Sequence, residues 1–291
     1  MPLQTSFTQL VGCEVPIQLA PMPLVGTPEL IGAVSDAGGM GALGTGPLPP
    51  EATAFLLDQA HAATDGPFSV NILLPFLDMD NVELAAKRAA VVDFYHGPVD
   101  PALIEFVHGY GTLAGWQVGS LLDAEAAVDG GADLLIVRGV EGGGRMYGTE
   151  SLWPLLVDVI ASTDVPVLAA GGIGNARGVA AALAAGAAGV RMGTRFLAAS
   201  ESGVHPQYRE ALIAESASGT VLTDDFSNDW PDELSSSRVL RSSLEAAHAF
   251  EGEVVGELAL GSQSFPISRF STAPPASGAS GEIQAMAMYA G

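Results

Sequence analysis

Residues 165–193 read VPVLAAGGIGNARGVAAALAAGAAGVRMG and contain a complete strand–helix–strand pattern. An apolar run ends in Gly171-Gly172, an alanine-rich segment follows, and a second apolar run begins near residue 188. This order is typical of a βαβ unit, which connects two parallel strands. Strands buried on both faces read as continuous apolar runs, as these two do. The segment therefore predicts a parallel sheet covered by helices.

The same alternation continues toward the N-terminus through the first two thirds of the 291 residues. Helix-like segments separate the apolar runs, and Thr27 and Asp100 each precede a proline, as N-cap residues often do. Continuously apolar strands in this number favour a closed (β/α)₈ barrel, the TIM barrel, and an open doubly wound sheet is the alternative. The predicted strands are 15–20, 40–44, 68–73, 91–95, 113–118, 133–139, 165–171 and 188–193.

The repeat stops after about residue 204, so we assign 1–204 to the barrel and 205–291 to a C-terminal cap. Residues 205–218 and 235–250 look helical, and an Asp- and Ser-rich stretch separates them. Residues 265–291 are loop-rich and then look helical. The tail has too few apolar residues to hold a core alone. We therefore expect a helical and loop-like cap packed on the barrel mouth.

Composition excludes several partner classes. The chain has 33 acidic and 11 basic residues, a net charge of −22, and such a surface repels nucleic acid and anionic membranes. Cys13 is the only cysteine, so no intrachain disulfide forms, which suits a reducing cytoplasm. The N-terminal residues lack signal-peptide features, and scattered histidines predict no metal site. We expect a cytoplasmic protein with a small-molecule substrate.

Two glycine-rich turns predict a phosphate site. Gly171-Gly172 ends one strand just before a helix, and Arg191-Met192-Gly193-Thr194 ends the next strand. Backbone without a Cβ approaches a phosphate closely, and amides at a helix N-terminus point toward it. Phosphate sites formed by the loops after the last two strands recur in these barrels.

Other candidate residues follow the remaining strands. The loop 140–148, VEGGGRMYG, carries three glycines before Arg145 and is suited to close over a planar ligand. Polar or polarisable residues also stand at strand ends, where barrel active sites form. They are Met22, Asn71, His96 and Gln117, each of which is equally explained by a structural role such as a buried hydrogen bond.

These motifs together resemble the nitronate monooxygenase family, formerly called 2-nitropropane dioxygenases. The matching segments are PIQLAPM, AVSDAGGMGALG, SVNIL, GWQVGS, VRGVEGGG, the run from Pro166 to Ser202 and the terminal AMAMYAG. They extend from Pro16 to the end of the chain. The resemblance implies a TIM barrel that binds flavin mononucleotide (FMN) at its mouth.

The resemblance also implies roles for individual residues. Met22 would lie beside the isoalloxazine ring and Asn71 would hydrogen-bond it, and Arg138 and Gly143 would contact the cofactor from the sixth loop. Family members typically carry glutamine at the position of Arg138. The phosphate would be held, mostly through backbone amides, by Gly172, Arg191, Met192, Gly193 and Thr194.

A second departure concerns the catalytic residue. Where the family pattern EAGGH ends in a histidine thought to act as a base, this chain has Glu141-Gly142-Gly143-Gly144-Arg145. Arginine stays protonated, so it does not act as a base, but it binds a carbonyl oxygen and stabilises an enolate. For proton transfer we consider His96 and Tyr147, with a rim histidine as the alternative reading of His96.

Three functions follow from the resemblance. The first is an FMN oxidoreductase acting on an activated carbonyl or acyl thioester, such as a CoA thioester, with NAD(P)H as a candidate electron donor. The second is a nitronate monooxygenase that oxidises alkyl nitronates with oxygen. The third is an NAD(P)H:quinone reductase or a flavin-binding protein with little turnover. The oligomeric state is open, a homodimer being one option.

Overall fold

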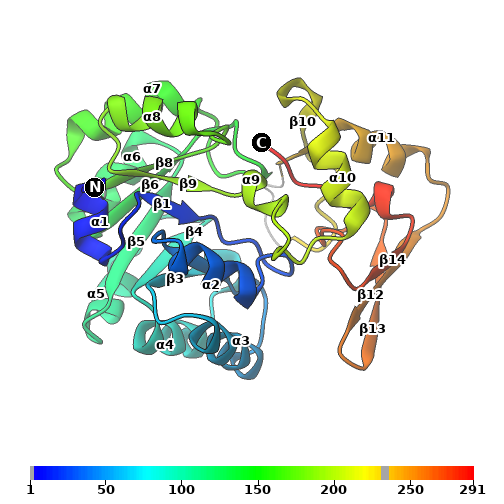
Figure 1. Cartoon of the computed structure of the whole chain (residues 1–291), viewed down its shortest axis with the longest axis horizontal. Coiled ribbons are helices and arrows are strands. Elements are labelled where there is room, and N and C mark those ends of the chain that lie inside the picture. Colours follow the sequence, from blue (N-terminus) through cyan, green and yellow to red (C-terminus); the bar gives the residue numbers. More distant parts are fainter. Residues whose placement is uncertain (1–2, 231–235) are drawn as a thin grey trace.

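The computed structural model describes residues 3–230 and 236–291 of the chain. Eight parallel strands form the central sheet, and helices cover its outer side (Figure 1). Each strand lies inside the range that its apolar run predicted, because buried parallel strands have an unbroken apolar pattern. The strands are β1 (Ile17–Leu19), β2 (Gly41–Gly44), β3 (Phe68–Leu73), β4 (Val91–Tyr95), β5 (Leu113–Val118), β6 (Leu134–Arg138), β8 (Val167–Ala170) and β9 (Gly189–Met192).

The sheet closes on itself. Its strand order is β1-β9-β8-β6-β5-β4-β3-β2, with parallel pairing throughout. The two ends meet at a parallel bridge between Gln18 and Met40. There the Leu19 N–H donates to the Met40 carbonyl at 2.9 Å, and the Met40 N–H donates to the Ile17 carbonyl at 3.0 Å. The predicted TIM barrel is thus confirmed, and the doubly wound alternative is excluded.

The covering helices begin at the caps that the sequence indicated. The Thr27 side chain accepts from the Leu30 N–H, and the Asp100 side chain accepts from the Ala102 N–H. The barrel helices are α2 (Pro28–Asp36), α3 (Pro50–Ala63), α4 (Met79–Arg88), α5 (Pro101–His108), α6 (Leu121–Asp129), α7 (Leu152–Ser162), α8 (Ala176–Ala184) and the short α9 (Thr194–Leu197), with a 3₁₀ turn η1 (Leu74–Phe76) after β3.

A short helix, α1 (Ser6–Val11), closes the N-terminal end of the barrel. Phe7 on this helix is fully buried and packs with residues at the starts of the strands, among them Val91, Leu134 and Ala188. Because this end is filled with apolar side chains, the opposite end, where the strands terminate, is left for function.

The cap contains strands as well as helices. One small sheet joins β10 (Thr220–Thr223), β11 (Ser237–Leu240) and β7 (Gly144–Arg145), the last of which belongs to the glycine loop after β6. A second sheet joins β13 (Gln263–Ser268), β12 (Val254–Leu260) and β14 (Ala279–Gly281), and β12 and β13 project as a hairpin (Figure 1). The remaining elements are α10 (Pro206–Ala214), η2 (Ala217–Gly219), α11 (Arg241–Ala249) and η3 (Ile283–Ala285).

Two helix predictions in the cap are wrong in part. The helix predicted over 235–250 begins only at Arg241, because 237–240 pair with β10 and β7; residue 235 lies outside the described residues. The end of the chain forms one 3₁₀ turn instead of a helix. There Tyr289 bridges Val239, and the Leu240 N–H donates to the Met288 carbonyl. Pairing with β11 outweighs the local helix propensity of AMAMYAG.

A second hydrophobic cluster lies mainly in the cap and includes residues of the barrel. Tyr208, Phe226, Leu240 and Met286 are among the buried residues of this cluster. Three buried residues from the barrel range 1–204 join them: Val25, Leu197 and Val204. The cap therefore packs on the barrel through a shared apolar contact close to the end of β1.

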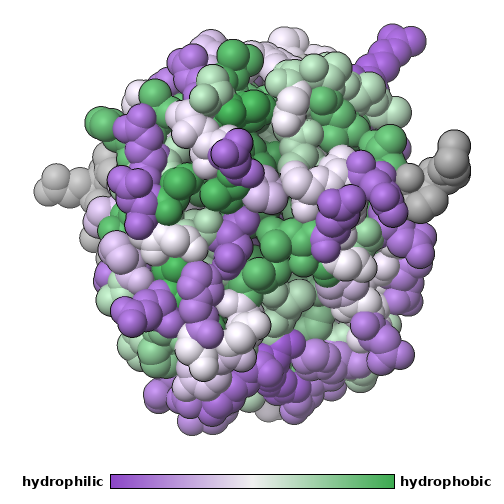
Figure 2. Space-filling view, turned by 90° about the vertical axis from the view of Figure 1, so that its left-hand side faces the viewer, coloured by the Kyte–Doolittle hydropathy of each residue, from purple (hydrophilic) through white to green (hydrophobic). Residues whose placement is uncertain are grey.

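Hydrophilic and hydrophobic residues are interspersed on the outer face that bears α1 (Figure 2). Within the described part of the chain, no helix has the length and apolar character needed to cross a membrane.

Candidate active site at the barrel mouth

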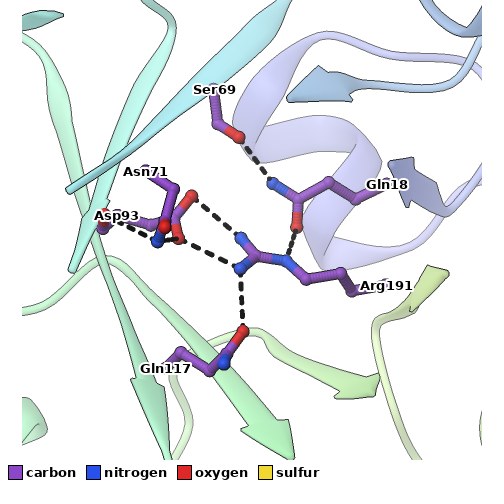
Figure 3. A network of polar contacts seen from close by, with 6 residues as sticks. All are labelled: Gln18, Ser69, Asn71, Asp93, Gln117 and Arg191. Atoms are coloured by element: carbon purple, nitrogen blue, oxygen red, sulfur yellow. Dashed lines mark hydrogen bonds and ion pairs between the residues drawn. The ribbon is translucent and has the colours of Figure 1, made fainter. Parts of the chain in front are cut away.

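A buried polar network fills the barrel interior beneath the mouth (Figure 3). Arg191 is at its centre: Nε donates to Gln18 at 2.8 Å, and Nη1 donates to Asp93 and to Gln117 at 3.0 Å each. Arg191 Nη2 lies 2.9 Å from the second Asp93 oxygen, which completes a buried ion pair. Asn71 Nδ2 donates to Asp93 at 2.7 Å. The network thus links five strands of the barrel, β1, β3, β4, β5 and β9.

Three residues predicted to bind the cofactor, Asn71, Gln117 and Arg191, have side chains that hydrogen-bond within this network. Arg191 is 3% exposed and its guanidinium serves Gln18, Asp93 and Gln117. The guanidinium is therefore engaged within the barrel, and a phosphate contact of Arg191 stays a prediction for its backbone amide. The Asn71 amide nitrogen is held by Asp93, and the Gln117 oxygen is held by Arg191. Asn71 and Gln117 are connected through the ion pair of Asp93 and Arg191.

The predicted phosphate residues lie at the ends of neighbouring strands. Gly171 and Gly172 have φ angles of 114° and 65°, in the region that favours glycine. After the next strand, a Cβ added to Gly193 would lie 3.2 Å from Ala20 and 3.5 Å from the Met22 sulfur. Met22 is thus placed beside Gly193, and Thr194 Oγ1 accepts from the Gly291 N–H at 3.1 Å.

Arg138 holds the glycine loop in place. Its side chain is buried at the end of β6 and donates to the Tyr95 hydroxyl and to the carbonyls of Gly143 and Arg145. A Cβ on Gly143 would lie 2.7 Å from the carbonyl carbon of Ala290. The predicted pair Arg138 and Gly143 is therefore in contact, and at Gly143 the loop packs against the end of the chain.

Arg145 points from the glycine loop into the cap. Its Nη2 donates to the Phe226 carbonyl, and its guanidinium carbon lies 4.7 Å from the centroid of the Trp230 ring. The Tyr289 hydroxyl is a further partner. Burial lowers the pKa of Arg145 from its usual value, and the charges of Tyr289, Asp229 and Asp224 oppose that shift. Arginine nevertheless remains a cation at neutral pH.

The two candidates for proton transfer, His96 and Tyr147, lie next to each other, and Tyr95 and Trp230 connect them to Arg145. The ring centroids of His96 and Tyr147 are 5.6 Å apart, and Tyr95 contacts both rings. His96 is 2% exposed and has a φ angle of 71°. A non-glycine residue in that left-handed conformation is uncommon, and such strain concentrates at functional sites. The structure therefore brings His96, Arg145 and Tyr147 into one cluster.

Gly119 allows the loop to carry Tyr147 past the end of β5. A Cβ on Gly119 would overlap the Tyr147 carbonyl oxygen and the Gly148 backbone. We expect Gly119→Ala to displace the loop that bears Arg145 and Tyr147 and to lower kcat/KM roughly 10- to 100-fold. Gly174→Ala is the matched control, since a Cβ there meets nothing within 4 Å. Equal steady-state kinetics for the two variants would contradict this role for Gly119.

The ionisation of Tyr289 is expected to lower the stability of the folded protein at alkaline pH. Burial raises the pKa of Tyr289 to about 12, although the neighbouring Arg145 guanidinium lowers it in part. A raised pKa means that the folded state retains the phenol proton more tightly than the unfolded state. This contribution is complete below about pH 10 and is lost as the pH rises toward 12. We expect Tyr289→Phe to lessen the fall in urea midpoint across that window; an unchanged pH profile would argue against it.

Sequence reasoning missed several residues of this region. Asp93 and Gln18 are polar residues inside the apolar runs VVDFY and PIQLA. A polar residue in a buried strand needs a hydrogen-bond partner, so these two positions indicate a buried polar network. Tyr95, Trp230 and Tyr289 carried no local signal, because cap folding alone brings Trp230 and Tyr289 to the glycine loop. Among the described residues, no group of three or more His, Cys, Asp and Glu side chains is arranged to hold a metal.

Comparisons with known proteins agree on one family. The family model described as nitronate monooxygenase matches residues 4–83 and 76–253. A (3aS,4S,5R,7aS)-5-hydroxy-7a-methyl-1-oxo-octahydro-1H-indene-4-carboxyl-CoA dehydrogenase of Mycobacterium tuberculosis is 37% identical over 226 residues, which cover 77% of this chain and 64% of that protein. A nitronate monooxygenase of Pseudomonas aeruginosa is 31% identical over 270 residues, covering 75% and 76%.

The relatives also include solved structures. FabK from Thermotoga maritima superposes with a TM-score of 0.77 at 36% identity, covering 86% of this chain and 79% of FabK. A nitroalkane oxidase from Streptomyces ansochromogenes has a TM-score of 0.78 at 25% identity, covering 98% and 91%. The chain spans just under two thirds of the length of the CoA dehydrogenases from M. tuberculosis and Rhodococcus jostii, at 64% and 63%.

Proposed function

The chain belongs to the nitronate monooxygenase family, and on that premise we propose that it is an FMN-dependent oxidoreductase acting on an activated carbonyl or acyl thioester. Members of this family are flavoproteins. The observation that carries the substrate proposal is the half-buried cation Arg145, in the loop where the family pattern has a histidine. Trp230 packs on both Arg145 and His96, and His96 contacts Tyr147. The name of the M. tuberculosis relative adds support for a CoA thioester.

The residues at the mouth fit FMN. Gly171 and Gly172 have glycine-type backbone conformations, and Gly193 leaves a space that a Cβ would fill next to Met22. These positions would hold the phosphate through backbone amides, with Thr194 beside them. Met22, Asn71, Gln117 and Arg138 would surround the ring system. When bound, FMN supplies two-electron redox chemistry.

The side chains of Arg145, His96 and Tyr147 would have separate roles in binding the substrate and transferring a proton. Arg145 would bind the substrate carbonyl oxygen and stabilise the negative charge that develops on it. It performs this role at any physiological pH because it does not lose its proton. His96 or Tyr147 would hold or deliver the proton at the neighbouring carbon. The cap residues around Arg145, Phe226 and Trp230, would exclude water from this oxygen.

A second candidate is oxidation of alkyl nitronates with oxygen. The nitronate monooxygenase of P. aeruginosa, 31% identical to this chain, favours it. A nitronate is already deprotonated, so no base is needed, and Arg145 would bind its nitro oxygens. This candidate predicts good turnover of nitronates and poor turnover of neutral nitroalkanes. An NAD(P)H:quinone reductase or a flavin-binding protein with little turnover is the third candidate.

An anaerobic absorbance experiment separates the candidates. Purified protein loaded with FMN is mixed with NADH, NADPH or propyl-2-nitronate, and crotonyl-CoA is then added to any sample whose flavin bands have bleached. Bleaching by a reduced nicotinamide and recovery with crotonyl-CoA supports the thioester proposal. Bleaching by the nitronate alone supports the second candidate. A protein that takes up no FMN refutes the cofactor proposal, and FMN that nothing reduces favours the flavin-binding protein.

A further inference from the structure

One cap residue, Trp230, contacts two of the three residues of the proposed catalytic cluster, Arg145 and His96. Trp230 lies in the loop after β10, and its ring centroid is 4.7 Å from the Arg145 guanidinium carbon. The centroid of the same ring is 4.8 Å from the centroid of the His96 ring, and the two planes are inclined at 67°. Phe76 contacts Trp230 at 5.2 Å. A single side chain from the cap therefore packs on the cation and on the histidine.

The indole N–H of Trp230 lacks a hydrogen-bond acceptor among the described residues. Nε1 is buried, and within the described residues it has no hydrogen-bond partner. An indole N–H is a donor only, so it needs an acceptor oxygen. Buried polar groups in native proteins are nearly always paired, and an exception calls for a ligand or a functional reason. Here the exception occurs next to the residue proposed to bind the substrate oxygen.

The guanidinium of Arg145 also depends on Trp230 for its position. Cation–π contacts with tryptophan are the strongest of this kind, and they gain strength where water is excluded. Together with the Phe226 carbonyl, the Trp230 ring restrains the Arg145 side chain, which has many rotamers of its own. A restrained cation loses less conformational entropy when it binds a substrate.

We propose that Trp230 is a substrate-contacting residue that donates its indole N–H to the acceptor oxygen bound by Arg145, while its ring positions Arg145. This proposal rests on the proposed function. It assigns the substrate oxygen two donors, one from the barrel loop and one from the cap. Phenylalanine at this position would keep the packing and lose the donor, whereas alanine would lose both.

The two roles are measured with two variants. For the donor role, the dissociation constant of crotonyl-CoA is measured by calorimetry on the FMN-loaded protein. Trp230→Phe is expected to weaken binding about 10-fold, which corresponds to one hydrogen bond to a buried oxygen. For the positioning role, the rate at which phenylglyoxal modifies Arg145 is followed by peptide mass spectrometry without substrate. Trp230→Ala is expected to raise that rate several-fold, and Trp230→Phe to leave it near the original value.

Trp153→Phe is the matched control, because Trp153 is 43% exposed on α7 and belongs to neither contact. Trp230→Phe with an unchanged dissociation constant overturns the donor role, and Trp230→Ala with an unchanged modification rate overturns the positioning role. If the original protein takes up FMN but does not bind crotonyl-CoA, the thioester class and the donor role both fail. The modification rates then still decide the positioning role, which is independent of the substrate.

Discussion

Arg145→Ala is expected to lower kcat/KM for the thioester substrate by about 100- to 1,000-fold while leaving the FMN content unchanged. The physical reason is that a preorganised donor at a developing oxyanion acts mainly in the transition state. Arg145 is half-buried, held by the Phe226 carbonyl and packed on Trp230. Steady-state kinetics with crotonyl-CoA and the flavin absorbance of the purified variant measure the two quantities.

Arg145→Lys is the control for charge, because lysine keeps the cation and loses the planar stacking surface and the fork of donors. It should recover only part of the lost rate. Arg145 also ties the loop to the cap, so the melting temperature of each variant must be compared with that of the original protein. A folded Arg145→Ala variant with full activity would mean that another group binds the substrate oxygen.

Asp93→Leu should lower the free energy of unfolding by about 3–5 kcal/mol. Leucine has the branched shape of aspartate but no charge, so Arg191 would remain as an uncompensated cation inside the barrel. Both side chains of this pair are 2% exposed or less, and water is therefore not available to replace the carboxylate. Asn71 would also lose its acceptor at 2.7 Å. Urea unfolding followed by circular dichroism gives the free energy.

The double variant Asp93→Leu/Arg191→Met separates the missing charge from poor packing. Removing both partners of a buried ion pair often costs little, because the desolvation penalty is removed along with the attraction. We expect the double variant to be more stable than Asp93→Leu alone. If the single variant loses less than about 1 kcal/mol, the usual range for surface pairs, the network contributes little to stability.

The barrel could be predicted because its signals are local. A buried parallel strand needs an apolar run of a few residues, and a covering helix needs a cap and an alanine-rich face, so both patterns are legible over short windows. Residues 68–73, 91–95 and 113–118 became strands with the predicted bounds. In the cap, residues 237–240 and the end of the chain were predicted to be helical, and both were misassigned because their conformation depends on strand partners far away in the sequence.

The candidate site likewise has features that the sequence predicts and features that depend on the tertiary structure. Position along the chain already placed Asn71, Gln117, Arg138 and Arg191 at strand ends, since the carboxyl ends of parallel strands meet at one mouth. What those side chains do there is set by their neighbours in space. The Arg191 guanidinium is bound by Gln18, Asp93 and Gln117, contributed by three other strands.

The amino-acid order alone therefore specified an α/β barrel, its glycine-rich turns and an arginine in the loop after β6, because backbone propensity and apolar periodicity act between near neighbours. Tertiary structure alone brought Trp230 and Tyr289 of the cap onto Arg145 and buried an ion pair between Asp93 and Arg191. Contacts between residues about a hundred positions apart arise from the packing of whole elements. The residues that make such contacts follow no periodic pattern in the sequence.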